Sequence, residues 1–143
     1  MAEAGLDGQP FSHSADRLAN AIVLATSSPT DPRTLAAWGA RIGVSRGALR
    51  VWCKAAHVQA RSCLDFLRVL RAVMLSRNEA CDLLSALDVV DERSLIRLLD
   101  RGGLRQLSAG QKPTTVEQFL ATQRFLENPQ LVRAVSRRLN VHS

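Results

Sequence analysis

The stretch TLAAWGARIGVSRGALRVWCK, residues 34–54, predicts a helix, a tight turn and a second helix. Two helices that cross closely need a small residue at the crossing and a turn residue that tolerates a positive φ. Gly39 meets the first need and Gly43 the second, while Ser45 stands where the second helix needs its N-cap. The apolar residues expected to hold the two helices together are Leu35, Trp38, Ile42, Val44, Leu49 and Trp52.

The outward side of the second helix is basic. Arg46, Arg50 and Lys54 recur at every fourth residue and therefore form one stripe. A helix fits the major groove of DNA, and arginine matches guanine edges and phosphates with paired hydrogen bonds. We predict a DNA-binding helix over 45–55, in which the arginines contact bases and Lys54 contacts phosphate. The candidate DNA-binding residues are Arg41, Ser45, Arg46, Gly47, Arg50, Val51, Lys54 and Arg61. The alternative is a helical hairpin whose arginine face is only solvated.

Positive charge is concentrated in this part of the chain. The 143 residues carry a formal net charge of +6, and residues 34–77 alone hold 8 cations and 1 anion. Residues 78–104 are instead net acidic, with 3 cations and 6 anions. A local excess of arginine favours an anionic partner, so double-stranded DNA fits the first of these segments better than the second.

Several classes of protein are not expected. No apolar run approaches the roughly 18 residues of a membrane span, and the first residues lack the pattern of a secretory signal. Cys53, Cys63 and Cys81 form no CxxC pair, which favours a reducing, cytoplasmic location. The sequence has no glycine-rich phosphate loop, no HExxH pattern and no recognisable nucleophile–base set. We therefore expect no enzyme, no cofactor, no metal and no small-molecule ligand.

The rest of the chain is also expected to be helical. Residues 1–12 are small and polar and predict a flexible tail, with the first helix beginning at the N-cap Ser14. A helical domain over 13–104 follows. In it, a linking helix at about 61–75 precedes a second helix-turn-helix pattern at 80–103. The predicted fold class is all-α, with two helix-turn-helix units joined by a linking helix, plus two C-terminal helices.

The C-terminal part has its own start signals. Residues 105–113 predict a linker, and residues 114–143 an extension of two helices. Thr114 with Glu117 predicts a capping box for the first helix, and Asn128 before Pro129 predicts the start of the second. Two interpretations of residues 114–140 stay open: a homodimer or protein-docking surface, or packing that completes the core of the same chain.

Some residues have a simpler structural interpretation. Trp38 and Trp52 fall on inner faces and are expected in the core, and Cys53 is expected as a small helix residue rather than a redox switch. His57 lies near a helix end, where it would interact with the helix dipole. In the linking helix, Arg61 and Asp65 are spaced for an ion pair. Two further arginines there, Arg68 and Arg71, are expected to be solvated rather than bound to phosphate.

Particular residues resemble a known family. Gly43-Val44-Ser45, Leu49, Lys54, Asp65-Phe66-Leu67 and Leu70-Arg71 are similar to the DNA-binding domain of AraC/XylS-type transcription regulators. In the second unit Asp91, Leu95, Arg97, Leu99 and Gly103 stand where that family usually has an acidic residue, an aromatic, an arginine, an aromatic and a glycine. The resemblance covers about residues 15–104. It implies a seven-helix domain with recognition helices at 45–55 and about 91–101 in successive segments of the major groove.

The second unit departs from the family pattern. Asp88 replaces the glycine of the second turn, and LRQLSAG stands where Thr-Pro is usual. Its acidic residues, which repel phosphates, are Asp88, Asp91, Glu92 and Asp100. We therefore expect the first unit to bind DNA as a transcription regulator without its own effector domain. The second unit would be a packing element or a weak contact. The competing hypothesis is a helical protein–protein adaptor that has kept this fold and lost DNA binding.

Overall fold

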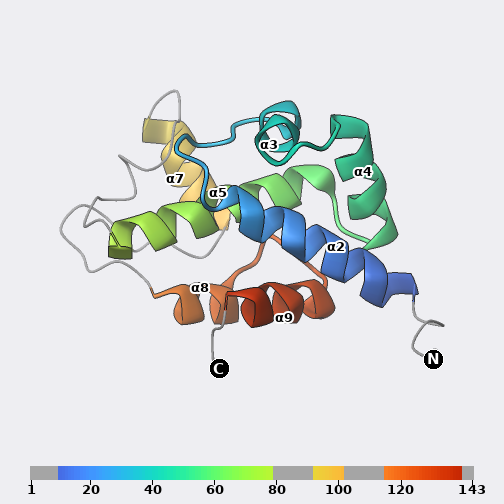
Figure 1. The fold of residues 1–143 in the computed structure, drawn as a ribbon. Helices are drawn as coiled ribbons and strands as arrows, with labels where there is room; N and C mark the ends of the chain where they lie inside the picture. Colours follow the sequence, from blue (N-terminus) through green and yellow to red (C-terminus); the bar gives the residue numbers. More distant parts are fainter. Residues whose placement is uncertain (1–9, 79–91, 102–114, 140–143) are drawn as a thin grey trace.

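The computed structural model describes residues 10–78, 92–101 and 115–139, and the regular structure in these ranges is α-helix without strands (Figure 1). The helices are α2 (Pro10–Ala25), α3 (Leu35–Ile42), α4 (Arg46–Ala55), α5 (Ala60–Asn78), α7 (Glu92–Arg101), α8 (Val116–Thr122) and α9 (Pro129–Arg138). The predicted all-α class is confirmed. Within these ranges, no helix is both long enough and apolar enough to cross a membrane.

The predicted helix, turn and helix of residues 34–54 are present as α3 and α4. The Thr34 hydroxyl accepts a hydrogen bond from the Ala37 N–H at 3.0 Å and so caps α3. Gly43 ends that helix in the left-handed region at φ 76°. A Cβ atom on Gly39 would overlap the Val44 carbonyl oxygen, so only glycine fits where the turn passes the helix. Ser45 then caps α4 by accepting from the Ala48 N–H at 3.0 Å.

The linking helix α5 forms the centre of the core. Figure 1 shows α5 and α2 crossing the middle of the molecule, with α3 and α4 on one side and α8 and α9 on the other. Phe66 of α5 is fully buried and stacks on Phe119 of α8, with ring centroids 5.5 Å apart. Trp38 of α3 is also fully buried, and its indole N–H donates to the Ala21 carbonyl of α2 at 3.0 Å. The predicted core position of Trp38 is therefore confirmed, whereas Trp52 is only partly buried.

The first helix begins earlier than the sequence pattern predicts. It starts at Pro10 rather than after Ser14, so residues 10–12 of the expected tail are helical. Proline suits the first turn of a helix because its missing N–H has no partner there in any case. The rest of the expected tail, residues 1–9, lies outside the described residues.

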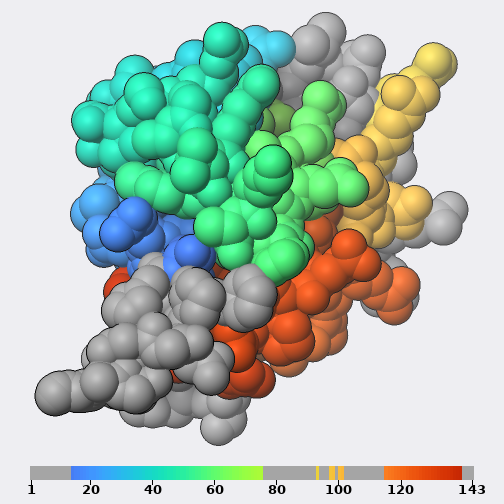
Figure 2. All heavy atoms as spheres, turned by 90° about the vertical axis from the view of Figure 1, so that its right-hand side faces the viewer, coloured from blue at the N-terminus to red at the C-terminus, as the bar shows by residue number. Residues whose placement is uncertain are grey.

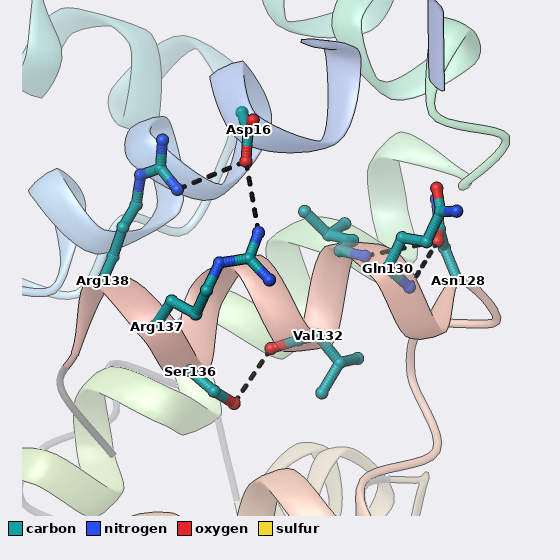
Figure 3. A network of polar contacts seen from close by, with 8 residues as sticks. Asp16, Asn128, Gln130, Val132, Ser136, Arg137 and Arg138 are labelled. Carbon is teal, nitrogen blue, oxygen red and sulfur yellow. Dashed lines mark hydrogen bonds and ion pairs between the residues drawn. The ribbon is translucent and has the colours of Figure 1, made fainter. Parts of the chain in front are cut away.

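The C-terminal helices pack into the same core. Among the described pairs of helices, α2 and α9 share the most extensive contact. Leu131 and Val135 of α9 are fully buried, and Arg137 and Arg138 reach Asp16 of α2 at 3.6 and 3.5 Å (Figure 3). The described residues 115–139 thus pack into the core of the same chain, and a homodimer or protein-docking surface on this segment stays a prediction.

The start of α8 differs from the predicted capping box by one residue. Thr115 with Gln118, not Thr114 with Glu117, forms the reciprocal pair of hydrogen bonds. Phe119 and Leu120 of the helix that starts here are buried. At α9 the predicted cap is confirmed: the Asn128 side-chain oxygen accepts from the N–H groups of Gln130 and Leu131 (Figure 3).

The second predicted helix-turn-helix unit is described only in part. Its last helix is present as α7, where Leu98 is buried. Its first helix and its turn fall within 79–91, and the predicted linker within 105–113, so both lie outside the described residues. Arg101 of α7 pairs with the buried carboxylate of Asp65 on α5 at 2.8 Å. Within the described residues this ion pair replaces the expected pairing of Asp65 with Arg61.

Candidate nucleic-acid interface

The outward face of α4 is a continuous exposed surface. Leu49 and Cys53 on its inner side are 0% and 1% exposed, which holds the helix against the core. The residues on its outer side are all exposed: Arg46, Gly47, Arg50, Val51, Lys54 and Ala55. Figure 2 shows the side of the molecule on which α4 lies, with the teal and green atoms of this region standing at the surface. The predicted site residues of α4 therefore share one accessible face.

The cations of this face lack compensating carboxylates. We call Arg46, Arg50 and Lys54 the basic stripe. No carboxylate in the described residues lies within ion-pair distance of any of the three. The carboxylates of the described residues 14–75 are Asp16, Asp31 and Asp65, and each is paired with an arginine outside the stripe. The stripe therefore presents positive charge that the described part of the chain does not neutralise.

The other predicted site residues lie on elements that adjoin α4. Arg41 is exposed in the last turn of α3, and its Nε donates to the Ser28 hydroxyl at 3.1 Å. This hydrogen bond ties the Arg41 guanidinium to the connection between α2 and α3. Arg61 is exposed in the first turn of α5, shortly after α4 ends. Ser45 uses its hydroxyl as the N-cap acceptor, so its role in this structure is to start α4.

Two arginines of the basic segment are structural, which corrects the expectation that they are solvated. Arg68 donates hydrogen bonds to the Asp31 carboxylate: its Nε lies 3.1 Å from both oxygens and its Nη2 lies 2.8 Å from one of them. Arg71 is 3% exposed, and its Nε donates to the Ser28 carbonyl at 2.9 Å. Both hold the connection between α2 and α3 against α5. The sequence contains no local sign of this role, because Asp31 lies 37 positions from Arg68.

The far end of α4 is anchored by contacts that the sequence analysis did not find. The Asn128 side-chain N–H donates to the Ala56 carbonyl, the C-cap of α4, at 2.7 Å. His57 follows in the left-handed region at φ 58°, and the Val58 N–H closes the turn onto the Cys53 carbonyl at 3.0 Å. The N-terminal turn of α4 is thus set by Gly39, and its C-terminal end by the start of α9.

A pair of thiols lies under α4. Cys53 and Cys63, from α4 and α5, are free and buried, which confirms that Cys53 is a packed helix residue. A hydrogen bond to Cys53, together with complete burial, holds the pKa of the Cys63 thiol well above its ordinary value. Cys63 therefore stays protonated and donates to the Cys53 sulfur. Both groups act as core residues that join the two helices.

The comparisons with known proteins identify no similar protein. No family model matches the chain, and neither the curated proteins nor the solved structures contain a match. The resemblance to AraC/XylS-type regulators accordingly stays a prediction.

Proposed function

We propose that this protein binds double-stranded DNA by placing α4 in the major groove, and that it acts as a transcription regulator. The observation that carries the proposal is the basic stripe: cations at every fourth residue, exposed and without a described carboxylate partner. An exposed helix face of this kind matches the width of the groove and the charge of the phosphates that border it. The small residue at Gly39 and the turn at Gly43 support this, because they allow the close packing of the turn on α3 that fixes the start of α4.

The residues of the stripe have distinct roles in this proposal. Arg46 and Arg50 bear the planar group that can bind a guanine edge with two hydrogen bonds. Lys54, one turn after Arg50, bears a compact charge suited to phosphate. Arg41 and Arg61 lie on the elements before and after α4 and would contact the flanking backbone.

The test is fluorescence anisotropy with a mixed-sequence duplex at about 50 and 200 mM salt. Release of counterions from three or four phosphates predicts a loss of roughly 40- to 150-fold in affinity between these conditions. Lys54→Ala should bind more weakly and lower the salt slope by about 0.9. Arg50→Ala should also bind more weakly. On a selected site we expect it to lose roughly 5- to 150-fold and to relax the base preference.

The matched control is Arg133→Ala, which removes an exposed arginine from α9 instead of from α4. It should leave both the affinity and the salt slope unchanged. Circular dichroism establishes that each variant is folded. The proposal is wrong if folded wild-type protein does not bind, or if binding does not depend on salt. It is also wrong if Arg133→Ala weakens binding as much as Lys54→Ala does, since binding would then follow total charge rather than α4.

A further inference from the structure

The outward face of α4 has a second, uncharged part. Gly47 and Val51 lie one turn apart beside the basic stripe, and both are exposed. We call these two residues the uncharged flank. Val51 is 64% exposed, and in the described residues the one other large hydrophobic that is exposed is Leu24, at 53%. A β-branched residue that is mostly exposed gains little from burial and has less than average helix propensity. The packing of the chain therefore does not account for Val51.

Gly47 is also not required by the fold. Among the glycines with described backbone, the left-handed conformation belongs to Gly43 and not to Gly47. A Cβ atom added at Gly47 would meet only the Ser45 Oγ at 3.9 Å, an ordinary contact. Gly39, by contrast, has no room for a side chain. Glycine destabilises a helix relative to alanine, so Gly47 weakens the first turn of α4 without a compensating contact in the described chain.

Both residues make sense if a surface approaches α4 closely at this point. A missing Cβ lets a ligand come near the helix backbone, and the valine methyl groups offer an apolar contact beside that gap. The adjacent cations select an anionic partner. In the major groove the apolar group on a base edge is the C5-methyl group of thymine. A groove that carries phosphates on its borders and a methyl group on its floor matches both parts of the face.

We propose that Gly47 and Val51 bind the C5-methyl group of a thymine, which makes them specificity-determining residues of α4. This inference rests on the proposed DNA-binding function and names the base that the uncharged flank recognises. The methyl group lies over Gly47 and against the Val51 side chain, while the basic stripe holds the neighbouring phosphates and base pairs. The target sequence therefore contains a thymine at a fixed position next to the base contacted by Arg50.

The first experiment removes only the methyl group. A duplex containing the site selected by wild-type protein is compared with duplexes in which each thymine in turn is replaced by uracil. Replacement at one position should weaken binding about four-fold, the effect of one buried group of this size. Val51→Ala should bind the thymine duplex more weakly and lose the difference between thymine and uracil at that position. The control Leu24→Ala, which removes the other large exposed hydrophobic of the described residues, should keep both the affinity and the difference.

The second experiment uses Gly47→Ala, for which stability and binding should move in opposite directions. The melting temperature should rise by about 2–4 °C, because alanine favours the helix. The affinity for the thymine duplex should fall at least about five-fold, because the new methyl group occupies the place of the thymine methyl.

The outcomes separate this inference from the DNA-binding proposal. If wild-type protein binds the site, yet every uracil duplex binds equally well or Gly47→Ala binds unchanged, the thymine contact is wrong and DNA binding stands. A fall in melting temperature for Gly47→Ala would show a structural glycine and also overturn the inference. If the folded wild-type protein binds no DNA, both proposals fail together.

Discussion

At the scale of single residues, glycines spaced four apart in this chain serve different purposes. Gly39 makes space for the Val44 carbonyl, and Gly43 adopts a backbone conformation that other residues rarely take. Gly47 does neither. The same residue type therefore serves close packing at one position, a turn at the next and, in our proposal, the approach of a ligand at the third.

We predict that Gly39→Ala destabilises the fold by about 1–3 kcal/mol, the range for an added group in a packed site. The cause is the overlap of the new Cβ with the Val44 carbonyl oxygen, which would displace the turn before α4. Urea denaturation followed by circular dichroism measures this change. Gly47→Ala is the matched control and should shift the midpoint in the other direction. An unchanged midpoint for Gly39→Ala would contradict the close approach of the turn.

At the scale of elements, α4 is well capped at its start and strained just after its end. The Ser45 hydroxyl accepts a hydrogen bond from the Ala48 N–H in the first turn, and Gly43 ends the preceding helix in the left-handed conformation. At the other end His57 occupies the left-handed position at which glycine is usual. Three hydrogen bonds stabilise this turn. The His57 N–H donates to the Lys54 carbonyl and the Val58 N–H to the Cys53 carbonyl. The Asn128 side-chain N–H donates to the Ala56 carbonyl.

Replacing His57 by glycine should therefore give a more stable protein than replacing it by alanine. The expected difference is about 1 kcal/mol, since a side chain in the left-handed region costs roughly that much and glycine does not. Both variants lack the imidazole, so the contribution of its contacts cancels in this comparison. Thermal denaturation of the two variants measures the difference. Equal melting temperatures for His57→Gly and His57→Ala would contradict backbone strain at this position.

At the scale of the whole molecule, buried charges hold distant segments together around α5. The Asp31 side chain is 1% exposed and the Arg68 side chain 13%, so their ion pair is nearly removed from water. Arg71 and the Ser28 carbonyl form a second link to the same connection. These contacts set the path from α2 to α3, and with it the direction in which α4 emerges.

Removal of one partner of this pair should cost about 3–5 kcal/mol, because it breaks an ion pair that is nearly removed from water. We predict this loss for Arg68→Met in urea denaturation. The double variant Asp31→Asn with Arg68→Met should lose less than the sum of the two single losses, since the residues are in direct contact. The exposed control Arg133→Met should stay within about 0.5 kcal/mol of wild type. Additive losses would show that the pair does not act as a unit.

The features determined by the sequence itself are those that depend on a few neighbouring residues. The all-α class, the α3–turn–α4 unit, the caps at Ser45 and Asn128 and the buried face of α5 follow from local spacing, and the structure has each of them. The outward placement of the α4 cations follows from the same periodicity. Helix periodicity and capping act over three or four residues, so the linear sequence is sufficient for them.

Only the tertiary structure decided which cations remain available to a partner. The sequence places Arg50 and Arg68 in the same basic segment, yet Arg50 is exposed on α4 and Arg68 is bound to Asp31. Arg101 of α7 lies 36 positions from Asp65, with which it pairs. Asn128 lies 72 positions from Ala56, the C-cap of α4, to which it donates a hydrogen bond. Such pairings follow from how helices pack rather than from spacing along one helix. Periodicity along the sequence therefore cannot predict them. They hold α4 and the neighbouring helices in position.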